Sequence, residues 1–288
     1  MALRWLCPGI LLTYSLITAN LQEPFPQGFS MGNQGTVLWE NGSQGCQPWI
    51  SAAYCDSSRK FGMALGAVSY YDRMDNFIDE SIYRAFGGVF WSIKRIRFKL
   101  AVSHFSALEM YYEQAGFLSA GVDLFSHFRA GIDFCGIRTG LNGYKQKKRT
   151  VGECAFSAWF PFKAAALGLS LNHINLKSGR VQGVDAPLVI KSGFHTVSNR
   201  MGAQGVIIEI TPSRVHPVRF ILGEQYRLFN IVAIEASLAN NPFLIGIGVL
   251  VDVSSISVSV SVVNHPVLGW SRGFSALYSS LNEDSLIK

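Results

Sequence analysis

The residues whose types and spacing could do chemistry begin with His104 and Ser106, which stand two positions apart. On an extended strand both side chains would point to the same face. A histidine can act as the base for a serine nucleophile, so the pair is compatible with hydrolysis of a lipid ester. The sequence places no asparagine or acid to orient the histidine, and serine is common in the chain. We therefore predict no catalytic residue, with lipid hydrolase as a minor alternative.

A second set of chemical groups consists of charged side chains that recur at alternate positions of apolar segments. On strands, we expect them to share the inward face. There they could pair across neighbouring strands, hold an N-terminal segment in place, or line a pathway. Pairing is the expected role, and the other two stay open. The set comprises Arg97, Lys99, Asp123, Arg129, Asp133, Arg138, Glu153, Glu209, Arg219 and Glu235.

The cysteines and glycines indicate no cofactor. Beyond Cys7 the chain holds Cys46, Cys55, Cys135 and Cys154, whose spacing matches no zinc site and which allow three pairings. Cys46 and Cys55 could close a short loop. The segments that carry Cys135 and Cys154 predict a hairpin with the two thiols on opposite faces. Gly246-x-Gly248 lies within a predicted strand that no helix follows, so it is not a dinucleotide fingerprint.

The net charge is +6, but the basic residues are scattered apart from Lys145–Arg149, which we interpret as a solvated loop. An exported chain has little access to nucleic acid, so we exclude it as a partner. The sequence opens with Arg4 and an apolar stretch typical of a signal peptide, with cleavage expected after Ala19.

The element that must position these groups is a strand with one apolar and one polar face. Ile256–Val262 reads ISVSVSV, and this period of two is typical of such a strand. The chain is 49% hydrophobic and 15% charged, yet no run of about 18 apolar residues follows the first twenty positions. A β-barrel in a membrane explains both facts, because its lipid-facing residues alternate with lumen-facing ones.

The pattern predicts an all-β fold, a transmembrane antiparallel up-and-down β-barrel of about fourteen strands. We expect a signal peptide at 1–19, an N-terminal plug or hatch segment at 20–58, the barrel at 59–280 and a periplasmic tail at 281–288. The predicted strands are 60–71, 83–93, 96–106, 115–125, 129–139, 150–159, 164–174, 187–198, 202–211, 217–224, 229–239, 244–252, 255–263 and 272–280.

Most connectors alternate in length, as the outside loops and periplasmic turns of such barrels do, although two outside connectors, 212–216 and 240–243, are short. The longer ones are 72–82, 107–114, 140–149, 175–186 and 264–271. Aromatic residues gather near the predicted strand ends and indicate two interfacial belts. One belt comprises Trp91, Phe125, Phe128, Trp159, Phe160, Phe162, Tyr226 and Phe229; the other comprises Tyr70, Tyr71, Tyr83, Tyr111, Tyr112 and Trp270.

Three segments resemble the FadL-type outer-membrane barrels, in particular their PorV/PorQ-like branch. They are GFSMGNQGTV (Gly28–Val37), LGEQYRLFNIVAIEASLANNPFLIGIGV (Leu222–Val249) and NHPVLGWSRGFSALY (Asn264–Tyr278). The resemblance implies fourteen strands with an N-terminal hatch. It also implies either passage of hydrophobic compounds or service in a secretion apparatus.

We therefore expect a protein of the outer membrane of a Gram-negative bacterium, in contact with outer-membrane lipid. Its expected partners are a hydrophobic small molecule, or a secretion-system or surface protein. The rival interpretation is a secreted soluble β-sandwich that binds a ligand.

Overall fold

The computed structural model describes residues 51–54, 59–70, 82–107, 111–125, 128–141, 149–162, 165–175, 188–198, 202–212, 218–228, 231–240, 243–265 and 269–281. Within these residues the chain forms fourteen β-strands and one short 3-10 element, η2 (Ala52–Tyr54). In the same part of the chain, no helix is long and apolar enough to cross a bilayer.

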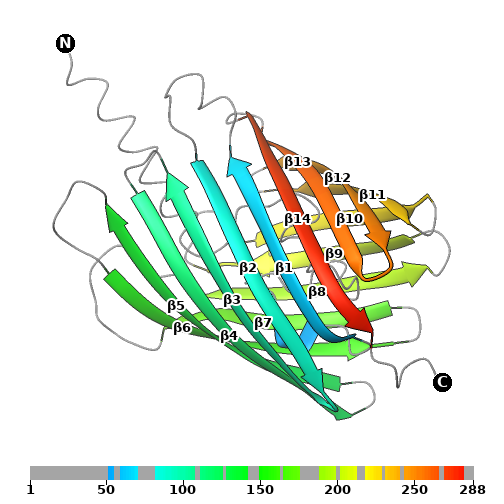
Figure 1. The fold of residues 1–288 in the computed structure, drawn as a ribbon, viewed down its shortest axis with the longest axis horizontal. Helices are drawn as coiled ribbons and strands as arrows, with labels where there is room; N and C mark the ends of the chain where they lie inside the picture. Colours follow the sequence, from blue (N-terminus) through cyan, green and yellow to red (C-terminus); the bar gives the residue numbers. More distant parts are fainter. Residues whose placement is uncertain are drawn as a thin grey trace.

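The strands follow one another around a single closed barrel in which every neighbouring pair is antiparallel (Figure 1). The last strand pairs with the first, so the sheet has no free edge. In chain order they are β1 (Arg59–Tyr70), β2 (Ile82–Ile93), β3 (Ile96–Ala107), β4 (Tyr111–Phe125), β5 (Phe128–Leu141), β6 (Arg149–Pro161), β7 (Ala165–Asn175), β8 (Val189–Ser198), β9 (Gly202–Ile210), β10 (Val218–Arg227), β11 (Val232–Ala239), β12 (Leu244–Val253), β13 (Ile256–His265) and β14 (Gly269–Leu281).

All fourteen predicted strands are present, and the predicted antiparallel barrel is confirmed. The largest difference is in β4, which begins at Tyr111 and not at 115. The ladder to β5 continues to the pair Tyr111 and Leu141, so the connector predicted at 107–114 shortens to 108–110. Likewise the connector predicted at 264–271 is 266–268. The expectation that both are long was therefore wrong.

The two ends of the barrel differ in their connectors. At one end, here called the loop rim, the connectors include 71–81, 142–148 and 176–188. At the other end, the turn rim, strands join through tight turns such as 94–95 and 254–255. Strand β1 begins and β14 ends at the turn rim.

The alternation predicted for ISVSVSV is present in β13. Val260 is 54% exposed on the outside of the barrel, whereas Ser259 is 2% exposed on the inside. The Ser259 hydroxyl forms a 2.6 Å hydrogen bond with the hydroxyl of Ser275 on β14. Outward side chains such as Met63, Leu118 and Ile247 continue this apolar exterior on other strands.

An apolar exterior of this extent is far larger than a soluble monomer exposes. A closed barrel also satisfies its backbone hydrogen bonds internally, as a segment in lipid must. The barrel is therefore of the transmembrane kind.

Aromatic side chains divide between the two faces. Tyr83, Tyr226 and Trp270 point outward and are 40%, 49% and 43% exposed, as an interfacial belt requires. Three of the residues assigned to the belts instead point inward and are buried, namely Tyr70, Tyr111 and Trp159. Tyr71 and Phe229 lie outside the described residues. The belts are thus sparser than predicted, because position near a strand end does not fix the face.

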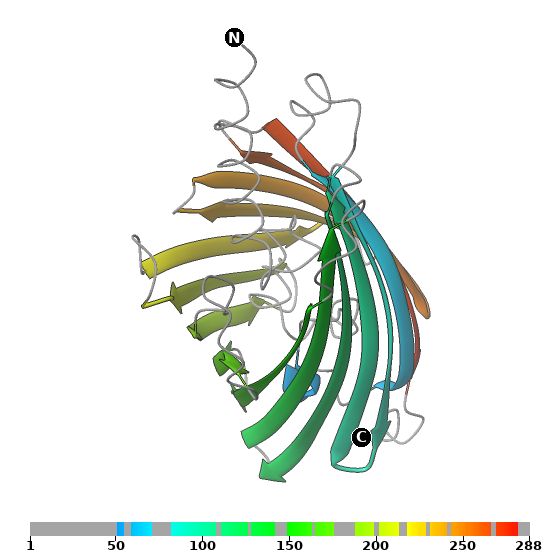
Figure 2. The ribbon, with the colours of Figure 1, turned by 90° about the vertical axis from the view of Figure 1, so that its left-hand side faces the viewer.

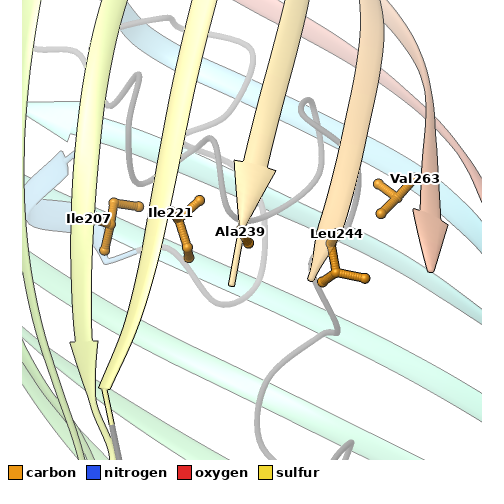
Figure 3. Packing of buried hydrophobic residues seen from close by; sticks show 5 residues of the cluster. All are labelled: Ile207, Ile221, Ala239, Leu244 and Val263. Atoms are coloured by element: carbon orange, nitrogen blue, oxygen red, sulfur yellow. The ribbon is translucent and has the colours of Figure 1, made fainter. Parts of the chain in front are cut away.

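Part of the inner wall is apolar. Ile207, Ile221, Ala239 and Leu244 are successive register partners on β9 to β12, and Val263 of β13 completes the cluster. Figure 3 shows these side chains side by side across neighbouring strands. Each is 5% exposed or less. The lumen therefore offers an apolar wall in addition to its polar groups.

Candidate functional site in the barrel lumen

Nine of the charged residues singled out in the sequence lie on the inward face of the barrel. Arg97, Lys99, Glu209 and Glu235 are each exposed by 1% or less. The remaining five are Asp123, Arg129, Asp133, Glu153 and Arg219.

Arg138 is the exception, and its assignment to the lumen was wrong. Its neighbour Ile137 is buried on the inside, so Arg138 points outward, where it is exposed. Its register partner is Gln114, which is also exposed. The inward set of β5 is odd-numbered, and an arginine at an even position must face the other way.

A compact ion cluster joins β3, β4 and β5 near the turn rim. Arg97 donates to both carboxylate oxygens of Asp123 at 2.8 and 2.6 Å. Arg129 approaches the same carboxylate through Nε at 3.3 Å. A bidentate pair of this kind is strong and directional, so it fixes both side chains against the wall. Its role is to hold the wall together rather than to leave a charge open to the lumen.

Beside this cluster the wall binds a piece of the N-terminal segment. The backbone N–H of Ala52 donates to the Ser119 hydroxyl at 2.7 Å, and the Ser157 hydroxyl donates to Ser51 at 2.6 Å. Ser119 in turn donates to the carboxylate of Asp133. Element η2 packs on β3 to β6, inside the ring of strands (Figure 2). Ser51–Tyr54 is therefore held in the lumen by the hydroxyl groups of Ser119 on β4 and Ser157 on β6.

Two glycines leave space for Ser51–Tyr54 against the barrel wall. Gly121 and Gly131 are register partners on β4 and β5. A Cβ on Gly121 would lie 2.7 Å from the backbone N of Ala53, and a Cβ on Gly131 would lie 2.6 Å from Ser51 Oγ. At Gly121 the close atoms are backbone atoms, so any larger residue there would displace the segment from the wall. The prediction of a plug at 20–58 otherwise falls outside the described residues.

A second polar group lies toward the loop rim, and the sequence reasoning missed it. Arg84 of β2 pairs with Glu113 of β4 at 3.2 Å, and both are buried. The Arg84 guanidinium also lies 5.2 Å from the centre of the Phe105 ring, within cation–π range. Tyr70 and Tyr111 contact that ring edge-on at 6.1 and 6.0 Å. The alternation of Tyr111, Glu113 and Ala115 could have revealed this group.

The opposite wall carries looser polar contacts. Glu209 of β9 lies 3.9 Å from Lys191 and 4.0 Å from Arg219. Gln225 donates to the Glu235 carboxylate at 3.0 Å. Between this wall and β1 the lining is small and hydroxylic, with Ser257, Ser259, Ser261, Ser271, Ser275 and Ser279 all buried. The lumen thus combines paired charges, hydroxyl groups and apolar patches.

The His104 and Ser106 pair does point outward, as its spacing predicts. The register neighbours of His104 are Ala85 and Gln114, and its ring centre lies 6.0 Å from that of Tyr83. Neither register neighbour is an acid that could orient the imidazole. The pair therefore does not form a triad with these neighbours, and we assign it no chemistry.

The two described cysteines are free. Cys135 pairs in register with Glu153, while Cys154 pairs with Phe134, so the thiols face opposite sides as predicted. Cys46 and Cys55 lie outside the described residues.

Comparison with known proteins places this architecture among solved barrels. The chain is similar to the CymD monoaromatic hydrocarbon channel at a TM-score of 0.58 and 11% identity, over 91% of this chain and 98% of that one. It is similar to a FadL homologue of Pseudomonas aeruginosa at a TM-score of 0.57 and 11% identity, over 85% and 95%. At such identities the likeness shows the fold. No family model matches the sequence. No curated protein matches it either.

Proposed function

We propose that the protein is an outer-membrane channel for small, mostly apolar molecules, narrowed by the segment that contains Ser51–Tyr54. The seat of this segment in the lumen carries the proposal. A barrel of fourteen strands has an interior wider than its own side chains fill, so it can hold both an inserted segment and a conduit. The fold shared with a hydrocarbon channel and a FadL homologue supports the same function.

The chemistry of the lining favours apolar cargo over ions. The principal arginines lie against carboxylates, as Arg97 does with Asp123 and Arg84 with Glu113. The apolar cluster around Ile221 and a second cluster of Ala64, Phe90 and Leu277 give a neutral molecule surfaces to contact. A porin for small ions would instead need charged rings facing water.

The proposal is tested by uptake into whole cells. The full chain is produced in the outer membrane of a porin-poor Gram-negative host, and entry of the hydrophobic dye N-phenyl-1-naphthylamine is followed by fluorescence. We expect faster dye entry than in cells with an empty vector, because the barrel bypasses the polysaccharide surface. Unchanged dye entry, with folded barrel present in the outer membrane, would contradict the proposal.

A matched variant separates passage through the lumen from general damage to the membrane. Ile221→Asp places a carboxylate in the apolar inner wall, whereas Ile221→Val preserves it. We expect the aspartate variant to slow dye entry and the valine variant to leave it unchanged. Both must show the heat-modifiable gel mobility of a folded barrel.

Service in a secretion apparatus is the second candidate function. Its support is the resemblance of Leu222–Val249 and Asn264–Tyr278 to PorV/PorQ-like barrels. Deletion of the gene in its own host distinguishes the two roles. Loss of exported surface proteins with unchanged dye uptake would favour secretion over transport.

A further inference from the structure

The outward face of β1 to β6 carries a groove with a glycine floor. One line of register partners runs across these six strands. It consists of Leu65, Gly87, Val102, Gly116, Gly136 and Gly152. Leu100, Leu118 and Phe134 lie along one side, and the groove encloses a volume of about 850 Å³. It opens toward the lipid and has an almost wholly apolar lining.

These glycines have no explanation within the described barrel. A Cβ added to Gly116, Gly136 or Gly152 would meet no atom within 4 Å. This contrasts with Gly121 and Gly131, where a Cβ would collide with the seated segment. Glycine weakens a strand, and within one it often marks the close approach of a ligand or another backbone. The floor is therefore shaped for something outside the chain.

Polar side chains lie beside the groove, on the same outward face and nearer the loop rim. The next line of register partners contains Ala85, His104, Gln114 and Arg138. It lies two residues farther along each strand, or about 6.6 Å. The line after it contains Tyr83 and Tyr112, which belong to the interfacial belt. Arg138 and its neighbours thus lie just below the level of the tyrosines.

The cost of an exposed arginine on the lipid face depends on its depth in the bilayer. Such a residue costs about 2–4 kcal/mol at the bilayer midplane and about 0–1 kcal/mol near the interface. The described residues show no carboxylate paired with Arg138, whose register neighbour is the uncharged Gln114. A guanidinium matches phosphate by two parallel hydrogen bonds. The position and chemistry of Arg138 therefore fit a lipid phosphate.

We infer that the groove and Arg138 together form a binding site for one anionic, phosphate-bearing lipid of the surrounding membrane. One acyl chain lies over the glycine floor, and the phosphate binds Arg138 beside Gln114 and His104. Five strand intervals of about 4.8 Å give a groove about 24 Å long. One leaflet is about 15 Å deep, so the groove can hold an acyl chain that runs obliquely through the leaflet. The inference is independent of any passage through the lumen.

The test measures lipid retention by the purified full chain. The protein is titrated in detergent with dioleoylphosphatidylglycerol or dioleoylphosphatidylcholine, and bound lipid is counted by native mass spectrometry. We expect one tightly retained phosphatidylglycerol and weaker retention of phosphatidylcholine, whose ammonium group would lie near Arg138. Arg138→Gln should weaken retention about tenfold, the factor that loss of a charge-assisted hydrogen bond gives. Gly136→Leu should weaken it about tenfold by filling the floor.

Two control variants lie outside the site. Arg272→Gln removes an outward arginine of β14, and Ala120→Leu enlarges an outward residue of β4 near the turn rim. Both should retain the lipid as the unchanged protein does, and all variants must show folded-barrel mobility. If Gly136→Leu does not fold, the single variant Gly136→Ala replaces it. Its lipid retention is then compared with that of Arg138→Gln.

Three results would overturn the inference. They are equal retention of the two lipids, retention unaffected by both site variants, and displacement of the lipid by inorganic phosphate alone. The last result would mean that only an anion site exists and that the groove contributes nothing.

Discussion

Asp123 is the residue on which the polar wall near the turn rim depends. It accepts both hydrogen bonds from Arg97 and also contacts Arg129. Arg97 is 1% exposed and Asp123 25% exposed, so removal of the carboxylate leaves a mostly buried guanidinium without its partner. Removal of one partner should therefore destabilise the barrel by more than the pair itself contributes to the free energy of unfolding.

Asp123→Ala should lower the free energy of unfolding by about 3–5 kcal/mol, because a buried guanidinium loses its carboxylate. The measurement is a urea titration of the barrel in lipid vesicles, scored by heat-modifiable mobility. Arg227→Gln is the control, since Arg227 and Asp252 lie 3.9 Å apart and are 41% and 34% exposed. That change should cost about 0–1 kcal/mol. Equal costs would show that burial does not govern these pairs.

A substitution at Gly121 tests whether Ser51–Tyr54 narrows the lumen. Gly121→Ala places a Cβ 2.7 Å from a backbone atom of Ala53, so the seated segment must move. We expect a higher single-channel conductance in planar bilayers than for the unchanged protein. The same substitution at Gly87 meets only an ordinary contact of 3.7 Å and should leave the conductance unchanged. Identical conductance in the two variants would refute a narrowing role for Ser51–Tyr54.

At the scale of strands, the depth of a residue on the outward face decides what it tolerates. Val260 lies in the middle of β13 and Val253 at the end of β12, and they are 54% and 57% exposed. Val260→Lys should cost about 2–4 kcal/mol of folding free energy and Val253→Lys about 0–1 kcal/mol. Urea titrations in vesicles measure both. A cost that does not depend on depth would indicate that this face does not meet lipid.

The inward face of the same strand is also restrictive. Ser259 is buried and hydrogen-bonded to Ser275, so a charge there needs space that the wall does not offer. We nevertheless expect a charge at Ser259 to be tolerated better than one at Val260, because only Val260 faces lipid.

Strand existence was predictable from sequence, because alternation of period two is a local signal. In β13 the serines and valines assign the two faces without any knowledge of neighbouring strands. The start of β4 was not predictable in this way, since Tyr112 and Gln114 interrupt the apolar set on the outward face. As a result the buried pair of Arg84 and Glu113 was missed.

Hydrogen bonds between residues far apart in the chain could not be predicted from the sequence, for a different reason. Ala52 binds Ser119 across 67 positions, and Ser51 binds Ser157 across 106 positions. No local pattern encodes such a contact, although the inward glycines Gly121 and Gly131 are a signal in retrospect. The charge of Arg138 suggests the lumen, but its even position in β5 places it on the outward face.

The whole molecule has opposite polarity to a soluble protein. Its exterior is mostly apolar, its interior holds ion pairs and hydroxyl groups beside apolar clusters, and its sheet closes on itself. This polarity explains why fourteen strands need no covering helices. It also separates the barrel from the soluble β-sandwich considered in the sequence, whose apolar faces would pack against each other.

The two faces can be distinguished directly by tryptophan fluorescence in vesicles of brominated phospholipid. Trp270 points outward and is 43% exposed, whereas Trp159 points inward and is 0% exposed. Two variants, each retaining one of these residues with every other tryptophan changed to phenylalanine, are compared in brominated and ordinary lipid. We predict strong quenching of Trp270 and little quenching of Trp159. Equal quenching of the two, or no quenching of Trp270, would contradict a barrel whose outward face lies in the membrane.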